Sequence, residues 1–422
     1  MKTFKQKVKM LFQGTFFKNI SVLVGATAFA QLITIITIPI LTRLYSPEDF
    51  NVLAIYSSVI ALISVVSCLR LEIAIPIPKE DEDAVALLFL SICSVVGITI
   101  LTVIGVVLLS TQIEKVTDGQ LIGFMWLIPL SVFFAGVYKA LQYWATRKKA
   151  FSLVAKTRLS QAVSGSGTQL GFGYTGMAPI GLLIGQLVNI SGGVIGLSRY
   201  FLNNNLSLVR VLNVDKLKST FKRYDRFPKY SVLESFANTG ATQIPVILIA
   251  YYAVSAEAGF LMLATRLLSI PISLIGSAVA QVYISEAARK YEKGLLKEFT
   301  HKIIITLLKI GAIPIAFVGV IAPFIIPLIL GERWERTGII ISWMVPWFLM
   351  QFITSPVSMT LHITDHQKLA MILQFVGFLL RVGTVMVGGL YFQEYITEIY
   401  SISGFIFYSL YLLIVLIVLK KY

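Results

Sequence analysis

The chain has 422 residues, of which 56% are hydrophobic and 14% are charged, and its mean hydropathy is +0.81. Because soluble domains carry about 25% charged residues, this composition excludes a soluble globular protein. The formal net charge of +15 would suit a protein that binds nucleic acid. The placement of the basic residues along the chain instead favours a membrane protein.

Apolar runs as long as a membrane span recur from one end of the chain to the other. A helix needs about 20 mainly apolar residues to cross a bilayer. We predict twelve spans, at 19–41, 51–75, 85–110, 121–145, 151–175, 178–200, 229–253, 257–285, 302–330, 337–361, 367–391 and 396–419. The runs at 151–175 and 229–253 are the most polar. We expect no separate soluble domain and no cleavable signal peptide, because the first apolar run is long enough to stay in the membrane.

The basic residues fall mostly on one side of these spans. With the N-terminus in the cytoplasm, only Arg43, Lys115, Arg333 and Arg336 among the loop residues lie on the opposite side. This bias predicts that both termini are cytoplasmic. The positive charge is then mainly a topology signal, helped by anionic lipid, and we expect no nucleic-acid partner.

The pattern of spans restarts after Arg199–Lys229, the longest hydrophilic stretch. The run Ser255-Ala256-Glu257-Ala258 begins one span as Ser46-Pro47-Glu48-Asp49 begins another. Two six-helix halves that both start inside are typical of alternating-access transporters. We therefore predict a basic cytoplasmic arm at 1–18, an N-terminal six-helix lobe at 19–200, a cytoplasmic linker at 201–228 and a C-terminal six-helix lobe at 229–422.

The stretch Phe227–Tyr283 predicts two long apolar helices joined by a tight turn, each with one polar stripe, since residues three or four apart share a helix face. The first stripe holds Ser231, Glu234, Asn238, Thr242 and Pro245. The second holds Gly259, Met262, Arg266, Ser269, Ser273 and Gly276. A charge that faces hydrocarbon is costly, so both stripes are expected to face a shared polar interior.

Charged residues inside the predicted spans give that interior a net positive charge. The basic ones are Arg70, Lys139, Lys156, Arg158, Arg266, Lys309 and Arg381, and the clear acids are Glu72 and Glu234. The three lysines lie near the inner ends of their helices, where snorkelling to the interface is an equally good explanation. A simple pairing of Arg70 and Glu72 with neighbouring residues at an inner gate is a second alternative.

Arg266 and Arg381 lie deeper and are harder to explain by structure alone. Arg381 shares a stripe with Gln374, Gly377, Thr384 and Gly388. The fork of donors on a buried arginine suits phosphate. We predict a diphosphate site in a cavity drawn from Arg266, Arg381, Arg70, Lys139 and Arg158, with Gln31, Asn238 and Gln374 as polar cavity residues. Glu234 and Glu72 could neutralise an arginine or bind a coupling cation, and the sequence leaves both roles open.

No catalytic motif and no P-loop is present, so we expect no enzyme activity and no cofactor. Energy would come from an ion gradient, the membrane potential or the substrate gradient. Cys68 and Cys93 both fall inside spans, which predicts neither a disulfide nor a metal site. His362, Asp365 and His366 form only a weak metal candidate, because further ligands are missing.

Four stretches resemble bacterial polysaccharide flippases, and the resemblance covers essentially the whole chain. They are Leu41–Phe50 (LTRLYSPEDF), Tyr143–Lys149 (YWATRKK) followed by Phe151, Phe227–Tyr283, and Leu330–Trp334 (LGERW). These flippases export O-antigen and capsule units and belong to the multidrug/oligosaccharidyl-lipid/polysaccharide (MOP) superfamily.

The resemblance implies an all-α integral membrane protein with two six-helix lobes around a central cavity, in a MATE-like fold. It also implies that undecaprenyl-diphosphate-linked oligosaccharide moves from the cytoplasmic to the periplasmic leaflet of the bacterial inner membrane. Membrane lipid, a polysaccharide polymerase and a chain-length regulator are the further partners it implies. The positive interior suits a diphosphate headgroup independently of the resemblance.

Three rival functions are considered. A multidrug exporter of the same superfamily would favour an acidic cavity, and the first span has no acid. A lipid II flippase usually carries two further helices, which we do not find here. A membrane polymerase or ligase would carry a large outer loop, whereas the predicted outer loops are short.

Overall fold

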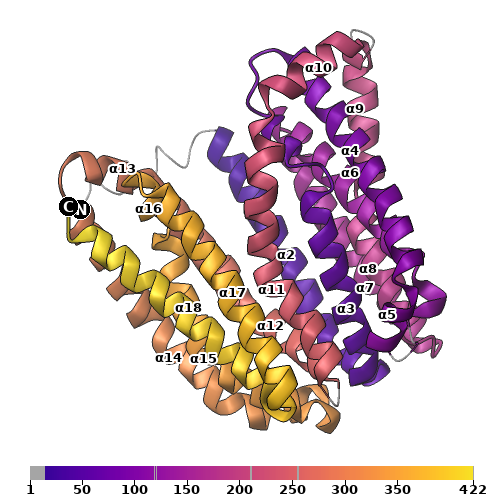
Figure 1. Ribbon diagram of the computed structural model, residues 1–422, viewed down its shortest axis with the longest axis vertical. Coiled ribbons are helices and arrows are strands. Elements are labelled where there is room, and N and C mark those ends of the chain that lie inside the picture. Colours follow the sequence, from indigo (N-terminus) through magenta and orange to yellow (C-terminus); the bar gives the residue numbers. More distant parts are fainter. Residues whose placement is uncertain (1–14, 118, 120, 210–211, 254–255, 422) are drawn as a thin grey trace. The chain divides into compact units, whose positions relative to one another are not determined.

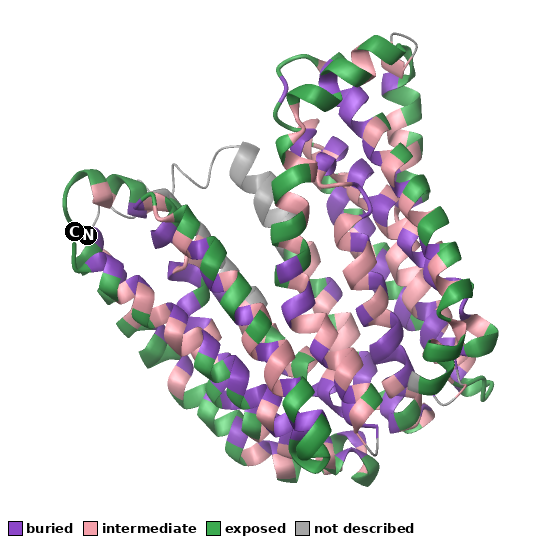
Figure 2. Cartoon of the chain, in the orientation of Figure 1, coloured by how far each residue is buried: buried purple, intermediate pink, exposed green. Residues whose placement is uncertain are grey.

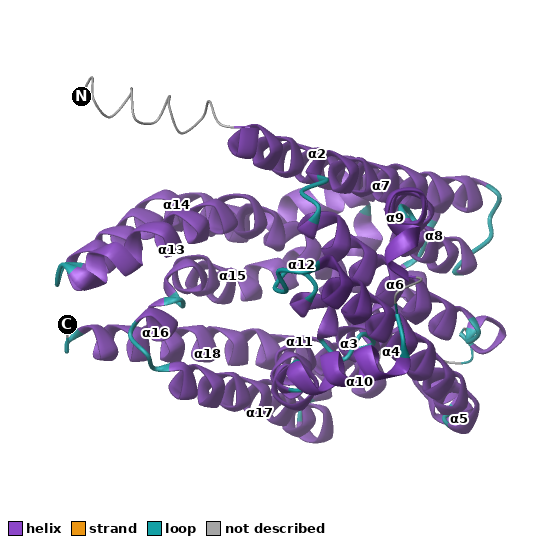
Figure 3. Ribbon diagram, turned by 90° about the horizontal axis from the view of Figure 1, so that it is seen from above, coloured by secondary structure: helices purple, strands orange, loops and turns teal. Residues whose placement is uncertain are grey.

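The computed structural model describes residues 15–421, except 118, 120, 210–211 and 254–255. The predicted basic arm at 1–18 therefore lies almost wholly outside the described residues, as does Ser255. The described chain consists of helices joined by short loops, without strands (Figure 3). This confirms the all-α fold class predicted from the apolar runs.

The first half of the chain forms one series of helices (Figure 1). Their bounds are α2 (Thr15–Leu44), α3 (Pro47–Val66), η1 (Leu71–Ala74), α4 (Asp81–Leu108), α5 (Ser110–Val116), η2 (Ile122–Phe124), α6 (Leu127–Arg147), α7 (Phe151–Tyr174), α8 (Ile180–Ser191), α9 (Val194–Val209), α10 (Val214–Arg223) and η3 (Phe227–Ser231). The predicted span at 51–75 extends too far, because α3 ends at Val66. Leu69 and Arg70 then adopt left-handed backbone angles, which an α-helix cannot contain.

The second half forms another series, from α11 onward. Its members are α11 (Val232–Tyr252), α12 (Glu257–Pro271), η4 (Ile272–Gly276), α13 (Ser277–Glu292), α14 (Leu296–Leu330), η5 (Glu332–Trp334), α15 (Glu335–Val357), α16 (Thr360–Ile363), α17 (Gln367–Tyr391), η6 (Gln393–Tyr395) and α18 (Ile396–Leu419). The predicted span at 257–285 is helical throughout, and the π-helical turn η4 lies within it between α12 and α13.

Within the described residues, nine helical segments are long and apolar enough to cross a membrane. The three remaining predicted spans correspond to α7, α11 and α12–α13, which are helical but more polar, and the last of them contains the π-helical turn η4. Buried positions gather where the helices of each unit face one another, and exposed positions lie on their outer sides (Figure 2). Many of those outer positions are large and apolar, such as Ile313, Phe324 and Leu328 on α14, as expected for a surface in contact with lipid.

The chain divides into two compact units. The first comprises the described part of Met1–Leu44 together with Val59–Glu114 and Gly119–Phe236. The second comprises Tyr45–Ser58, Lys115–Asp118 and Ala237–Tyr422. The first turns of α3 therefore group with the second unit, which the predicted boundary at residue 229 does not capture.

The predicted linker at 201–228 is part of the first unit and is largely helical. It contains the end of α9 and the whole of α10. Lys216 and Arg223 of α10 pair with Asp83 at the start of α4. The basic residues of this predicted linker are thus matched by an acid on a neighbouring helix of the same unit.

In the second unit, α14 packs along α15, and α15 and α17 pack along α18. Close approaches occur at glycines. A Cβ added at Gly319 would lie 2.8 Å from a methyl of Val345, and one added at Gly338 would lie 2.6 Å from the carbonyl oxygen of Ala322. The second unit is thus held by tightly packed helix pairs, which position the side chains of the site.

Arg336 is predicted from the sequence to lie in an outer loop, but it joins the N-terminal ends of three helices of the second unit. Its Nε and Nη2 donate to Glu257 of α12 over 2.7 and 3.2 Å, and its Nη1 pairs with Glu398 of α18 at 2.7 Å. Thr397 donates a further bond to Glu257. A charge that looked like a topology signal is therefore a partly buried cross-link.

Candidate functional site

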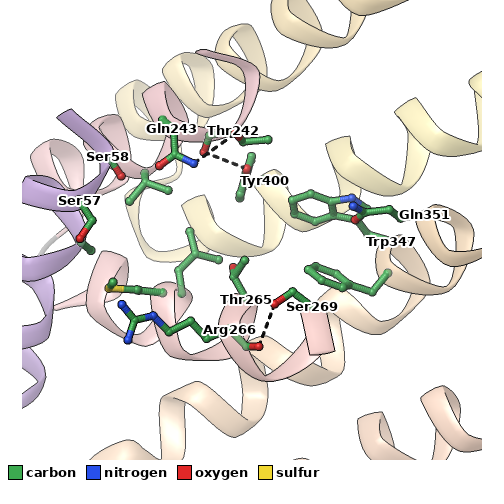
Figure 4. A pocket seen from close by; sticks show the side chains of 15 residues that line it. Ser57, Ser58, Thr242, Gln243, Thr265, Arg266, Ser269, Trp347, Gln351 and Tyr400 are labelled. Carbon is green, nitrogen blue, oxygen red and sulfur yellow. Dashed lines mark hydrogen bonds between the residues drawn. The ribbon is translucent and has the colours of Figure 1, made fainter. Parts of the chain in front are cut away.

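A polar pocket of about 310 Å³ lies within the second unit. Its walls come from the first turns of α3 and from α11, α12, α15 and α18 (Figure 4). The polar lining residues are Ser57, Ser58, Thr242, Gln243, Thr265, Arg266, Ser269, Gln351 and Tyr400, with Trp347 among the apolar ones. The pocket combines hydroxyl and amide groups with two aromatic rings that carry polar atoms.

Arg266 is the single charged residue among the fifteen side chains that line this pocket. It comes from the middle of α12, and Ser269 on the next turn donates a hydrogen bond to its backbone carbonyl over 2.9 Å. No described residue forms an ion pair with its guanidinium, which extends toward the side of the pocket where Ser57 lies (Figure 4). A cation without a carboxylate beside it makes the pocket suited to an anion.

The wall opposite Arg266 is formed by Thr242, Tyr400 and Trp347 (Figure 4). The hydroxyl of Tyr400 donates to the carbonyl of Thr242 over 3.4 Å. The Trp347 and Tyr400 rings meet edge to face with centroids 5.0 Å apart. A Cβ added at Gly404 would overlap the Trp347 ring, so the indole lies directly against the backbone of α18. This wall is therefore rigid.

Arg381 lies behind this wall and is not among the lining residues. It is 3% exposed, and its Cζ lies 4.4 Å from the ring centroid of Phe407, 5.4 Å from that of Tyr408 and 5.5 Å from that of Trp347. Its Nε and Nη2 have no hydrogen-bond partner among the described residues. The structure thus places the two deep arginines in one unit, with Arg266 in the pocket and Arg381 in an aromatic cage next to it.

The first unit holds a separate charged cluster at the end of α3. Arg70 Nη1 lies 3.5 Å from Oε1 of Glu72, which is 2% exposed. Lys139 of α6 donates to the carbonyl of Ser64 over 2.7 Å. Arg70 and Glu72 thus contact each other, and Lys139 binds a backbone carbonyl near the C-terminal end of α3, where carbonyls lack a partner within the helix.

The other predicted site residues are dispersed. Arg158 in the first unit lies over the ring of Tyr138, with 5.8 Å between Cζ and the ring centroid. Gln31 on α2 is half-buried, whereas Glu234 in the first turn of α11 is exposed. In the second unit, Asn238 on α11 is exposed and Gln374 on α17 is half-buried. None of these lines the polar pocket.

Sequence reasoning missed most of the pocket lining. Gln243, Gln351 and Tyr400 are uncharged, and analysis of intramembrane charge alone does not select them. A signal was present, because each is a polar residue inside a strongly apolar segment. Ser57 and Ser58 were missed because α3 was assigned to the N-terminal lobe.

The arrangement of helices is that of the MOP exporters. It is similar to the structure of the lipid II flippase MurJ in an inward closed conformation, with a TM-score of 0.71 and 14% identity over 93% of this chain and 86% of that chain. It is also similar to an inward-facing multidrug resistance MATE family transporter of the MOP superfamily, with a TM-score of 0.61 and 13% identity over 95% and 96% of the two chains. At such low sequence identities, these structural likenesses show the fold alone.

A third similar structure is a MOP superfamily transporter from Pyrococcus furiosus, described as having a binding pocket of reverse polarity. Its TM-score is 0.57, with 14% identity over 97% of each chain. A comparison with curated proteins found no match. The model of the polysaccharide biosynthesis protein family matches residues 40–338, and the chain belongs to this family. The family resemblance drawn from the sequence is thereby confirmed.

Proposed function

We propose that this protein is a flippase that carries undecaprenyl-diphosphate-linked oligosaccharide from the cytoplasmic to the periplasmic leaflet of the bacterial inner membrane by alternating access. The observation that carries the proposal is a pocket whose lining has one cation, Arg266, and no carboxylate. An arginine fork can bind a phosphate group through two parallel hydrogen bonds. The surrounding hydroxyl and amide groups can bond to sugar hydroxyls, and membership of the polysaccharide biosynthesis family supports that substrate.

The test is complementation of a strain from which the O-antigen or capsule flippase has been deleted. We expect the wild-type chain to restore surface polysaccharide, measured by gel and antibody, when the strain makes the matching repeat unit. A chain that is present in the membrane at a normal level and restores nothing, while the strain's own flippase does, would contradict the proposal.

A lipid II exporter is the second candidate, because the similarity to MurJ favours it and its substrate also carries a diphosphate. Depletion of the lipid II flippase in the same host separates the two. Rescue of growth without rescue of surface polysaccharide would select the lipid II exporter. A multidrug exporter is disfavoured, since Arg266 would repel a cationic drug and the lining offers no acid to attract it.

The proposed direction of transport requires both termini and the 201–228 segment to be cytoplasmic. Asn204, on the exposed side of α9, is a suitable reporter position. A cysteine placed there should resist a membrane-impermeant thiol reagent in intact cells and react after the cells are opened. Labelling in intact cells would contradict the proposed orientation of the protein in the membrane.

Glu72 remains a candidate for binding a coupling cation. Its Oε2 is buried and has no hydrogen-bond partner in the described chain, and its Oε1 lies 3.5 Å from Nη1 of Arg70. Glu234 is exposed, which makes it the weaker candidate. We expect the flippase to act beside a polysaccharide polymerase and a chain-length regulator, and to carry out no covalent chemistry itself.

A further inference from the structure

A second cavity, of about 210 Å³, lies in the second unit between α12 with η4, α14 and α15. All of its lining side chains are apolar. Phe348 and Phe352 are buried and form part of its floor, whereas Ile275, Ile310 and Val318 on its margin are exposed. The cavity is therefore a groove with a buried apolar floor and an open rim.

Local irregularities in the helices shape this groove. Gly311 faces Phe352, and a Cβ added there would lie 2.6 Å from a ring carbon, so any side chain would displace the floor. Pro314 has no N–H with which to continue the hydrogen bonding of α14. On the other wall, η4 is a π-helical turn, which widens the helix locally. Such interruptions are common at functional sites in membrane helices.

The groove adjoins the polar pocket. Arg266 lines the pocket, and the next residues on α12, Leu267 and Leu268, line the groove. Phe348 lines both cavities. An anion-binding residue and an apolar channel thus share one helix and one wall. That juxtaposition suits a ligand with a charged head joined directly to an apolar chain.

The groove also lies at the depth where such a chain would be found. Ile310 to Val318 occupy the middle of α14, which runs from Leu296 to Leu330. If α14 spans the bilayer, this segment is near its centre. The chain of a membrane lipid cannot enter the polar pocket without loss of its apolar surroundings, but the groove offers it an apolar path beside that pocket.

We propose that this groove binds the first isoprenoid units of the polyprenyl chain whose diphosphate is held at Arg266. The proposal rests on the proposed function and specifies how the lipid part of that substrate is recognised. Because hydrocarbon lipid is as apolar as the groove, the gain comes from packing against a fixed surface and not from leaving water. Its main consequence is orientation, since a held chain directs the headgroup into the pocket.

The first test compares farnesyl diphosphate with inorganic pyrophosphate, which lacks the chain, as ligands of the purified full-length protein in detergent. We expect the wild type to bind farnesyl diphosphate about tenfold more tightly, which corresponds to about 1.4 kcal/mol. Val318→Trp, which fills the rim, should lose this preference and still bind pyrophosphate. Ile313→Trp is the matched control, because Ile313 lies on the same helix, is 77% exposed and is outside the groove.

The outcomes separate the two proposals. If Val318→Trp binds pyrophosphate and still prefers farnesyl diphosphate, the groove does not bind the chain. The proposed headgroup site would not be affected by that result. Failure of the wild type to bind either ligand would contradict the headgroup site, and the second test then decides the groove by itself.

The second test does not depend on tolerance of a tryptophan. A photoreactive benzoyl-phenylalanine is placed at Ile310 or, as a control, at Ile313, in membranes that contain the lipid-linked oligosaccharide. We expect cross-links to the polyprenyl lipid at Ile310 and not at Ile313. Cross-links to phospholipid alone at both positions would mean that the groove holds bulk lipid and would overturn the proposal.

Discussion

Intramembrane charge is paired differently in the two units. The contrast is between the polar pocket of the second unit and the cluster of Arg70, Glu72 and Lys139 in the first. In the cluster, Arg70 contacts a carboxylate and Lys139 donates to a backbone carbonyl. In the pocket, Arg266 has no carboxylate within reach, although the helices around it carry hydroxyl and amide groups. A buried cation that contacts a carboxylate or a carbonyl needs no ligand for its charge, whereas a pocket-lining cation without a carboxylate partner is available to an anion.

The same contrast recurs within the second unit. Arg381 is as poorly paired as Arg266, but three aromatic rings enclose it. Cation–π contacts of about 1–2 kcal/mol each offset part of the cost of burying its charge. We therefore expect Arg381 to act through its electric field and through its cation–π contact with Trp347, without touching the substrate.

The largest effect is expected from Arg266→Ala. Loss of a charge-assisted bidentate bond of about 1.5–3 kcal/mol should lower export by at least about tenfold. Arg266→Lys should recover only part of the activity, because the charge stays but the fork is lost. Surface polysaccharide in the flippase-deleted strain is the measurement, with protein level checked by blot. Normal export by Arg266→Ala at a normal protein level would refute the anion site.

A smaller effect is expected from Arg381, and it should differ in kind. Arg381→Ala should reduce export, since it removes the buried charge and one support of Trp347. Arg381→Lys should restore export more fully than Arg266→Lys does, because a field needs the charge but not the fork. The same complementation assay compares the four variants. If Arg381→Lys is as defective as Arg381→Ala, Arg381 acts by direct contact.

Glu72→Gln should affect stability. It leaves Arg70 and Lys139 without a carboxylate in a buried site, which we expect to cost about 1–3 kcal/mol of unfolding free energy. The double variant with Arg70→Gln should recover part of the lost unfolding free energy, because the two substitutions affect the same contact and their effects do not add. Thermal unfolding in detergent measures both. Glu234→Gln is the matched control, because that carboxylate is exposed, and an equal loss there would contradict the explanation.

The smallest effect is expected from Arg158→Gln. Its contact with the Tyr138 ring is half-exposed and should contribute about 0.5–1 kcal/mol to unfolding free energy. Export should change little, because Arg158 does not line the polar pocket. The unfolding and complementation assays serve again. Loss of export by Arg158→Gln at normal stability would instead indicate that Arg158 contacts the substrate.

Much of the fold was predictable from the sequence because bilayer thickness fixes the length of an apolar span. Nine of the predicted segments have the required length and composition in the described chain. The errors arose where length and polarity misled. The span at 51–75 overran because Cys68 to Ile75 is apolar enough to extend a helix that the left-handed Leu69 and Arg70 end. The pairing of the 201–228 segment with α4 could not be predicted, because Asp83 is distant from it in sequence.

The candidate site was predictable only in part. Arg266 could be selected because an intramembrane charge on a polar stripe is costly unless it has a function. Arg381 was selected by the same rule, yet only the packing of Trp347, Phe407 and Tyr408 around it distinguishes a caged arginine from an open one. Helical periodicity predicts on which face of its own helix a residue lies. It does not predict which side chains of other helices pack against that face.

The sequence was therefore enough to infer an all-helical membrane protein that resembles polysaccharide flippases and has more basic than acidic residues inside its predicted spans. Composition and apolar length act locally, so they can be read along the chain. Only the tertiary structure decided that Arg266 lines a pocket, that Arg336 ties three helix ends together and that the first turns of α3 belong with the second unit. Those features depend on contacts between helices far apart in sequence, where the identity of the neighbour, and not the periodicity of either helix, sets the outcome.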